Sequence, residues 1–318
     1  MSKSVLDAKA LHDEAAAFAW VEERLWPNGP VCPHCGGVDR ISKMQGKSTR
    51  LGVYKCYHCR KQFTVKVGTV FEDSHVPMHL WLQAVYLMCA SKKGVSSNQL
   101  HRTLGVTLKT AWFISHRLRE AMRVVGAGPV GGEGQIVEAD ETFIGRKEGT
   151  EVRRGYFHKN AVLTLVERGG SARSFHIDAA TGRNIAPIIA AQAAKESRLM
   201  TDEATYYVTV GKQFVSHHSV KHALEEFGYT DPETGVNVNT NTVEGFYSIF
   251  KRGMKGIYQH CKEKHLHRYL AEFDFRYSNR VRLGVDDVER TVRAVKGAKG
   301  KRLTYQTTNR APSQTPAS

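Results

Sequence analysis

An α+β protein of several domains is the fold class that this sequence predicts, and three observations carry the prediction. Two CxxC pairs lie near the N-terminus, apolar residues follow helical spacing from about residue 77, and strand-like alternation begins after the glycine-rich linker GAGPVGGEG. At 318 residues the chain exceeds one ordinary small domain, so two or three folded units are expected.

The composition indicates a polyanionic partner. Lys and Arg number 46 against 31 Asp and Glu, which gives a net charge of +15. Nucleic acid is the commonest partner of such a chain, because each phosphate that a basic side chain neutralises releases a counterion. No apolar run is long enough to span a membrane, and the N-terminus lacks the plan of a signal peptide. We therefore expect a cytoplasmic protein without a membrane partner.

Residues 1–75 are predicted to form an N-terminal helix and a zinc ribbon. The segments VCPHCGG and KCYHCRKQF each offer two cysteines from one tight turn, with 20 residues between the two pairs. Four thiolates complete a tetrahedral site and leave no open position for a substrate, so the zinc is expected to be structural. His34 and His58 lie inside the turns and are the alternative ligands. The predicted zinc ligands are Cys32, Cys35, Cys56 and Cys59.

An amphipathic helix is predicted over residues 6–25, before the sequence WPNGP ends it. We expect this helix to pack on the ribbon. The residues between the two cysteine pairs alternate like a short hairpin, and their basic side chains fit contact with DNA phosphates.

Residues 76–125 are predicted to hold a buried helix and then a helix-turn-helix. MHLWLQAVYLMCA is nearly all apolar at helical spacing, which is typical of a buried helix. A short helix, NQLHRTLG, and a basic helix from Leu108 to Met122 follow, joined by a turn at Gly105, as in motifs whose second helix enters the major groove of DNA. Trp112 and Phe113 are expected in the core. The predicted DNA contacts of the second helix are Lys109, His116, Arg117 and Arg119.

Residues 133–285 have the strand-rich pattern of an α/β domain. QIVEADETFIG alternates as a strand, and NAVLTLVERGG and SARSFHIDAA are two more strands joined by a Gly-Gly hairpin. IAPIIAAQAAKES is predicted to be a helix, and RLMTDEATYYVTVG begins as a fourth strand. Three strands, a helix, a strand and a later helix is the order in which an RNase H-like domain begins.

Three acidic residues are placed to share one site in such a domain. Asp140 lies in the first strand, Asp202 ends the strand after the helix, and Glu244 lies in NTNTVEGFYSIFKRG, a later helix. Carboxylates that meet at one point repel unless cations lie between them, and two Mg²⁺ ions there could activate a hydroxyl and stabilise a leaving oxygen. Glu138 and Glu141 are assigned to the opposite pleat, which makes Asp140 the inward acid of its strand.

Lys251 stands seven positions after Glu244. Seven residues at about 100° each return nearly to the starting direction, so both side chains lie on one helix face. They are too far apart for an intrahelical salt bridge, and we expect Lys251 to hold a DNA phosphate beside the metals. Further candidates for DNA contact are Arg252, His217, His218, Asn279 and Arg280.

VEADETFIG, TDEATYY and TNTVEGFYSIFKRGMKGIYQH, with the zinc ribbon and the helix-turn-helix, resemble bacterial insertion-sequence transposases. The similarity covers roughly residues 10–285 and is to the zinc-ribbon branch related to the eukaryotic Merlin elements, the ISXO2-like transposases. It implies a DDE-type enzyme with two Mg²⁺ or Mn²⁺ ions and a structural Zn²⁺. Asp140 and Asp202 would be metal ligands, with Glu244 or Asn241 as the third ligand and Lys251 as the accompanying base.

The resemblance also implies an activity and its partners. The protein would bind the terminal inverted repeats of its mobile element in double-stranded DNA, cleave the ends and join the 3′-hydroxyls to target DNA. A homodimer or larger synapse at the nucleoid is implied, since two ends must be joined. A zinc-containing DNA-binding regulator and a non-joining RNase H-like nuclease remain the alternatives. Residues 286–318 are predicted to be a basic helix and a flexible tail, with phosphate contacts through residues 296–302.

Overall fold

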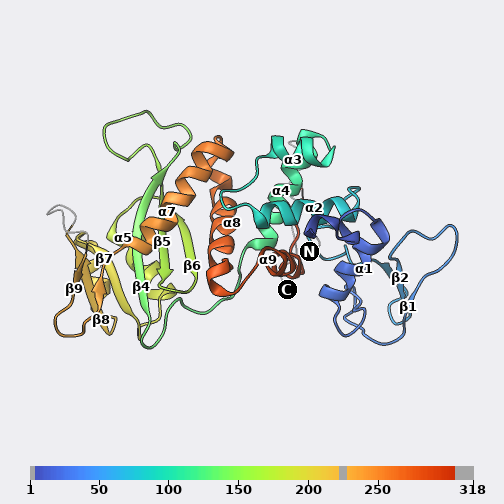
Figure 1. Ribbon diagram of the computed structural model, residues 1–318, viewed down its shortest axis with the longest axis horizontal. Helices are drawn as coiled ribbons and strands as arrows, with labels where there is room; N and C mark the ends of the chain where they lie inside the picture. Colours follow the sequence, from blue (N-terminus) through green and yellow to red (C-terminus); the bar gives the residue numbers. More distant parts are fainter. Residues whose placement is uncertain (1–3, 222–227, 305–318) are drawn as a thin grey trace.

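The computed structural model describes residues 4–221 and 228–304 and shows an elongated molecule, with a β-sheet at one end and a cysteine-containing ribbon at the other (Figure 1). Helices fill the middle, so the predicted α+β class is confirmed. Among the helices within these ranges, none combines the length and the apolar character that crossing a bilayer requires. The tail predicted beyond residue 304 lies outside the described residues.

The ribbon is a small antiparallel sheet onto which the N-terminal helix packs. Trp26, at the end of helix α1 (Glu14–Leu25), lies edge-on against Tyr54 and Phe63 of the ribbon, with ring centroids 5.5 and 5.8 Å away. The predicted packing of this helix on the ribbon is therefore confirmed. The ribbon strands are β1 (Ile41–Lys43), β2 (Tyr54–Cys56) and β3 (Gln62–Phe63).

Helix α1 is shorter than the sequence pattern predicts. Two 3₁₀ turns, Val5–Asp7 and Lys9–Leu11, precede α1 in place of a continuous helix. The Asp13 carboxylate accepts a hydrogen bond of 2.7 Å from the backbone N–H of Ala16 and so caps the helix at this point.

A helical body follows the ribbon and is closed by a helix from the C-terminal region. One apolar core joins α1, the three helices that follow the ribbon and α9 (Asp287–Lys296). Gly105 adopts a left-handed conformation, φ 65°, and lets the chain turn between α3 and α4. The helices of this body after the ribbon are α2 (Met78–Ala90), α3 (Ser97–Leu104) and α4 (Leu108–Met122).

The β-sheet has five strands in the order β6-β5-β4-β7-β8. The first three strands along the chain run antiparallel to one another, whereas β7 runs parallel to both β4 and β8. The edge strand β8 and a two-stranded ribbon, β9 (Tyr229–Thr230) with β10 (Asn237–Val238), were not predicted. The sheet consists of β4 (Ile136–Ile144), β5 (Asn160–Glu167), β6 (Ala172–Ile177), β7 (Arg198–Asp202) and β8 (Ser216–Val220).

Helices cover both faces of this sheet. One apolar core lies beneath α5 (Gly182–Gln192) and α6 (Tyr206–Gly211), and a second lies beneath α7 (Asn241–Gly253) and α8 (Leu266–Ser278). Helix α8 packs on β6 on one side and on α4 on the other, so it connects the sheet to the helical body (Figure 1). A π-helical turn, Met254–Tyr258, continues α7.

Candidate functional site

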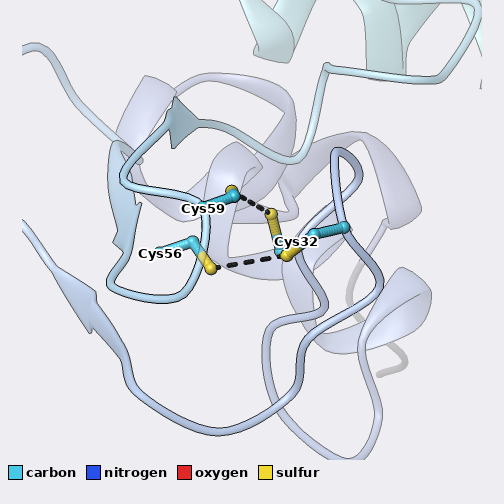
Figure 2. Close-up of side chains that lie close together, drawn as sticks. Cys32, Cys56 and Cys59 are labelled. Carbon is cyan, nitrogen blue, oxygen red and sulfur yellow. Dashed lines mark hydrogen bonds between the residues drawn. The ribbon is translucent and has the colours of Figure 1, made fainter.

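The four cysteines of the ribbon form one cluster, as predicted. The Sγ atoms of Cys32 and Cys59 lie 3.6 Å apart and those of Cys35 and Cys56 lie 3.7 Å apart, and all four sulfurs lie within 4.8 Å of one another (Figure 2). Sulfurs bound tetrahedrally to one zinc ion, at about 2.3 Å each, are about 3.8 Å from each other. The sulfur–sulfur distances therefore fit a single structural Zn²⁺. They are far longer than the sulfur–sulfur bond of a disulfide.

The backbone of the second turn favours the thiolate of Cys56. The backbone N–H groups of Cys59 and His58 point at Cys56 and lower the pKa of its thiol to about 7, which favours the thiolate that zinc binds. His34 and His58 are exposed, and His58 Nε2 lies 2.8 Å from an oxygen of Asp39. The cluster is thus built from cysteines, without either histidine.

A second cluster, of carboxylates, lies where β4 and β7 end their pairing. Asp140 comes from β4 and Asp202 from the last position of β7. Oxygens of these two side chains and of Glu141 all lie within 4.8 Å of one another. Two of the three acids predicted to meet are therefore together in this cluster.

The cluster is half-buried and crowded with negative charge. Burial, reinforced by the neighbouring charges of Glu141 and Asp202, raises the pKa of Asp140 to about 7. Burial also raises the pKa of Glu141, although the Tyr207 hydroxyl donates a hydrogen bond of 2.6 Å to its carboxylate. Hard divalent cations prefer such oxygen ligands, so the residues present fit Mg²⁺ or Mn²⁺.

Glu141 is the member of the cluster that sequence reasoning missed. It is on the opposite pleat from Asp140, as predicted, yet it reaches the same point. Pairing between β4 and β7 stops at Glu138 and Met200, so side chains from either face of β4 can enter the opening beyond that pair. The neighbouring acids in VEADET could have indicated that Glu141 belongs to the site. The alternation of side chains along a strand instead assigned Glu141 to the other face of the sheet.

The two candidates for a third ligand, Glu244 and Asn241, both begin helix α7. Glu244 is exposed and accepts a hydrogen bond of 3.0 Å from the Thr240 hydroxyl, and its charge contributes to raising the pKa of Asp140. Asn241 is exposed too, and its backbone N–H donates to the side chain of Asn239 at 3.1 Å. Glu244 thus acts on the cluster electrostatically and lies outside the set of three converging carboxylates.

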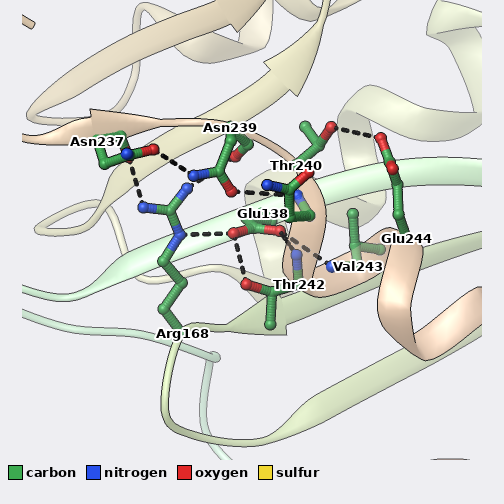
Figure 3. A network of polar contacts seen from close by, with 9 residues as sticks. Glu138, Arg168, Asn237, Asn239, Thr240, Thr242, Val243 and Glu244 are labelled. Carbon is green, nitrogen blue, oxygen red and sulfur yellow. Dashed lines mark hydrogen bonds and ion pairs between the residues drawn. The ribbon is translucent and has the colours of Figure 1, made fainter. Parts of the chain in front are cut away.

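Glu138 was predicted on the opposite pleat from Asp140, and this is wrong. Residues two apart on a strand share a face, and Glu138 accordingly faces α7 with no exposed surface. Its carboxylate accepts from the backbone N–H groups of Thr242 and Val243, at 2.8 and 2.9 Å, and from Arg168 Nε at 2.5 Å (Figure 3). Because Thr240 makes no side-chain cap, Glu138 caps α7 from the neighbouring strand.

Lys251 lies on the face of α7 that is closest to β4. Its Nζ is 6.0 Å from the ring centroid of Tyr247, one turn earlier. The Tyr247 hydroxyl in turn donates to the backbone oxygen of Asp140 at 2.5 Å and to that of Val162 at 3.2 Å. These contacts hold α7 against β4 and β5 beside Asp140, and Lys251 lies one turn further along the helix.

Three predicted DNA contacts of α4 face the protein interior, which corrects their assignment. His116, Arg117 and Arg119 are all less than 5% exposed. Arg117 donates to the backbone oxygens of residues 70 and 72, and Arg119 pairs with Glu272 at 2.7 Å. The reason is that α4 is the central helix of its body and packs on both α8 and α9. Lys109, in the first turn, is exposed.

The remaining candidates for DNA contact differ in exposure. Arg252 is exposed and donates to Ser248 within its own helix. Four others have partners elsewhere in the chain: His217 with Thr201, His218 with Asp231, Asn279 with Arg293 at the surface, and Arg280 with the backbone of Gly170. Trp112, predicted in the core, is only partly buried; its ring packs on His116.

Comparison with known proteins gives two family matches and one relative. Residues 131–278 match the model of the ISXO2-like transposase domain, and residues 12–62 match the transposase zinc-ribbon domain. A protein described as "Uncharacterized protein in transposable element ISH50", from Halobacterium salinarum, is 26% identical over 289 residues, which cover 86% of this chain and 93% of that protein. The match of residues 131–278 includes the whole carboxylate cluster, and the match of residues 12–62 includes all four zinc-site cysteines.

Proposed function

Since the chain belongs to the ISXO2-like transposase family, we propose that it is a DDE-type transposase that cleaves the ends of its mobile element and transfers the 3′-hydroxyl strands to target DNA. The observation that carries this proposal is the convergence of Asp140, Glu141 and Asp202 within the domain that matches the family. The sheet order, with three antiparallel strands followed by two parallel ones, supports an RNase H-like domain.

The carboxylates would act by holding divalent cations. Two Mg²⁺ or Mn²⁺ ions bound there would lower the pKa of an attacking hydroxyl and neutralise charge on the leaving oxygen. Asp140 and Asp202 would bind from the sheet and Glu244 from α7, with Glu141 held in place by Tyr207. We favour Glu244 over Asn241 as the third ligand, because the charge of Glu244 already acts on Asp140.

Lys251 would position the DNA and take no part in bond making. Its ammonium lies on the face of α7 that is turned toward β4, where it can bind a phosphate beside the scissile bond. Positioning and electrostatic stabilisation are the main contributions that proteins make to phosphoryl transfer.

End recognition would come from the ribbon and from the α3–α4 pair acting as a helix-turn-helix. The exposed first turn of α4, with Lys109, is the part of this pair that could enter a major groove. Arg252, in the last turn of α7, would bind a DNA phosphate next to the one held by Lys251. The net charge of +15 supports a DNA partner, and joining two ends calls for a dimer or larger synapse.

Purified protein, Mg²⁺ and a plasmid carrying the DNA that flanks the gene would test this proposal. We expect 3′-hydroxyl nicks at the element ends and joined products with the wild-type protein, and neither with Asp202→Asn. Sequence-specific binding without cleavage in either protein would support a DNA-binding regulator instead. Cleavage without preference for the ends, and without joining, would support a nuclease.

A further inference from the structure

The loop of residues 145–159 joins β4 to β5 at the edge of the sheet that carries the carboxylates. Strands β4 and β7 are parallel, so their C-terminal ends lie at the same edge, where β7 ends at Asp202. Strand β4 continues past Asp140 to Ile144, which is a distance of about 13 Å. The loop therefore begins close to the carboxylate cluster, and it extends beyond the end of the sheet (Figure 1).

This loop is basic and exposed. Its sequence, GRKEGTEVRRGYFHK, has five Lys and Arg against two Glu. Arg153 and Arg154, in the middle of the loop, are both exposed. Arg153 lies 3.9 Å from the carboxylate of Glu151, and the two side chains are 76% and 84% exposed. Such a solvated pair contributes little, so the positive charge of the loop is available to a polyanion.

The loop also displays apolar side chains, above all Phe157. Within residues 4–221 and 228–304, no large apolar side chain is more exposed than that of Phe157, at 84%. Val152 and Tyr156 of the same loop are exposed as well, at 67% and 57%. Apolar side chains that gather on the surface among charged ones are typical of an interaction site.

Contacts at the base of the loop fix the position of Phe157. The ring of the preceding residue, Tyr156, stacks on Phe143 of β4, with ring centroids 4.5 Å apart and an interplanar angle of 6°. The backbone N–H of Lys147 donates to the oxygen of His158 at 2.8 Å and so closes the loop. The exposed ring is thus held at a defined place relative to β4, the strand that carries Asp140.

The end of α7 meets the base of the same loop. A cavity of about 280 Å³ is lined by Gly145 and Lys159 from the loop and by Lys255 from the π-helical turn that continues α7. Lys251 lies one turn before Lys255. Basic side chains therefore lead from the part of α7 beside the carboxylates to the loop, and DNA bound along them would pass from one to the other.

We propose that residues 145–159 form a DNA-binding arm, in which Arg153 and Arg154 hold phosphates and the ring of Phe157 stacks on a base near the cleavage site. This inference rests on the proposed function. Basic side chains alone would fit any polyanion, whereas an exposed aromatic ring among them fits a nucleic acid, whose bases stack on it. A duplex offers the face of a base where it is kinked or opened. At 3.4 Å per nucleotide, about 13 Å of strand places that base at least about four nucleotides from the bond that is cut.

Binding titrations of the full-length protein without Mg²⁺, against a duplex that carries one element end, test the arm without cleavage. Phe157→Ala should weaken binding about tenfold at every salt concentration, and Phe157→Trp should restore it. Arg153→Gln should reduce the slope of log K against log salt by about one. Val215→Ala and Lys212→Gln are the matched controls and should bind like the wild type. Both are exposed and lie just before β8, whose start is at the opposite edge of the sheet.

A single mismatch, moved along the duplex, locates the base that Phe157 contacts. A mismatched base costs less to unstack, so at the contacted position the mismatch should tighten binding by the wild type several-fold. The same mismatch should not tighten binding by Phe157→Ala. Melting temperatures of all these variants should equal that of the wild type, because the substituted side chains are exposed.

Equal affinity of Phe157→Ala and the wild type for every duplex overturns the arm, as does absence of binding by the wild type. Weaker self-association of Phe157→Ala in sedimentation without DNA, at unchanged DNA affinity, would assign the ring to a second copy of the chain and also overturn it. Failure of strand transfer by the wild type overturns the proposed function, and the arm stands if end binding still depends on Phe157. Equal strand transfer and equal affinity of the wild type and Phe157→Ala overturn the arm alone.

Discussion

Asp140 and Asp202 face each other across two parallel strands, at the point where those strands stop pairing. The β4–β7 ladder runs from Ile136 with Arg198 to Glu138 with Met200, and the same register continued by two residues brings the aspartates together. Beyond Glu138 and Met200 the backbones of β4 and β7 are no longer paired, so side chains occupy the region between the two strands. An opening between strands, lined by acids, is thus built into the register of the sheet.

The first prediction is that Asp202→Asn stabilises the protein when Mg²⁺ is absent. The native pKa of Asp140 is raised to about 7, so its contribution to stability is complete below about pH 4 and is lost as the pH rises through 7. Removing the charge of Asp202 removes one of the repulsions that raise the pKa of Asp140, so less stability is lost at high pH. We expect an increase of about 1–2 kcal/mol in the free energy of unfolding at pH 8, and almost none at pH 4.

Thermal melts with and without Mg²⁺ check this prediction. Mg²⁺ should raise the melting temperature of the wild-type protein and should have much less effect on Asp202→Asn. Glu203→Gln, which changes the exposed neighbouring acid, is the control and should respond to Mg²⁺ like the wild type. Equal stabilisation of Asp202→Asn by Mg²⁺ would contradict a metal site at this position.

The second prediction concerns Glu138, which caps α7 from the neighbouring strand. Glu138→Gln keeps the shape of the side chain and removes the charge that accepts from Arg168 and from two backbone N–H groups. We expect a loss of about 2–4 kcal/mol in unfolding free energy, measured by urea denaturation, because a buried charge pair is broken. Glu133→Gln, an exposed acid in the preceding linker, should change it by less than about 0.5 kcal/mol. Similar stability in both variants would show that Glu138 does not anchor the helix.

The sequence predicts local features of this protein well. The cysteine pairs, the helix pair around Gly105 and the first strands of the sheet follow from spacing and alternation, which are properties of neighbouring residues. Asp140 and Asp202 could also be assigned to one site, because the strand order of the domain makes their strands adjacent.

Long-range packing could not be predicted in the same way. Arg117 and Arg119 have the sequence pattern of a basic DNA-binding helix, and only the packing of α8 and α9 on α4 makes them internal. Glu141 joins the cluster because pairing between two distant strands stops beside it. The edge strand β8 has polar residues at most positions, so its alternation carries no apolar signal.

The third prediction tests the zinc site by stoichiometry. One Zn²⁺ per chain should be released by each of Cys32→Ser, Cys35→Ser, Cys56→Ser and Cys59→Ser, since all four sulfurs converge. Cys261→Ser, outside the ribbon, should retain its zinc. Metal analysis of dialysed proteins measures the content, and proteolysis of residues 30–65 measures the accompanying unfolding of the ribbon. Full zinc content in two or more of the four variants would exclude a four-cysteine site.

The fourth prediction separates DNA contact from packing on α4. Lys109→Ala should weaken binding to end DNA several-fold and reduce the salt slope by about one, with little change in stability, because the side chain is exposed. Arg117→Ala should behave in the opposite way: it loses hydrogen bonds to three backbone oxygens of the fold, and the free energy of unfolding should fall by about 1–3 kcal/mol. Binding titrations at several salt concentrations and urea denaturation of both variants make the comparison. If Arg117→Ala weakened DNA binding without lowering stability, the prediction would be wrong, and Arg117 would contact DNA together with Lys109.

The fifth prediction concerns Glu272, which joins α8 to α4 and lies between two buried arginines. Although burial alone would raise the pKa of Glu272, the guanidinium groups of Arg276 and Arg119 hold it below its ordinary value. The stability that this carboxylate contributes is therefore present above about pH 4.5 and is lost as the pH falls through the lower native pKa. Glu272→Gln should cost about 3–5 kcal/mol at pH 7, because two buried cations lose their partner.

Denaturation curves at pH 7 and pH 3.5 give the measurement for Glu272. The difference in unfolding free energy between the wild type and Glu272→Gln should narrow at pH 3.5, because Glu272 of the unfolded wild-type chain is mostly protonated at that pH. Glu289→Gln removes an exposed partner of Arg293 on α9 and should cost no more than about 0.5 kcal/mol at either pH. A pH-independent difference would mean that Glu272 stabilises the junction of α4 and α8 by its shape alone, and the positive charges of Arg119 and Arg276 would then have to be balanced by another group.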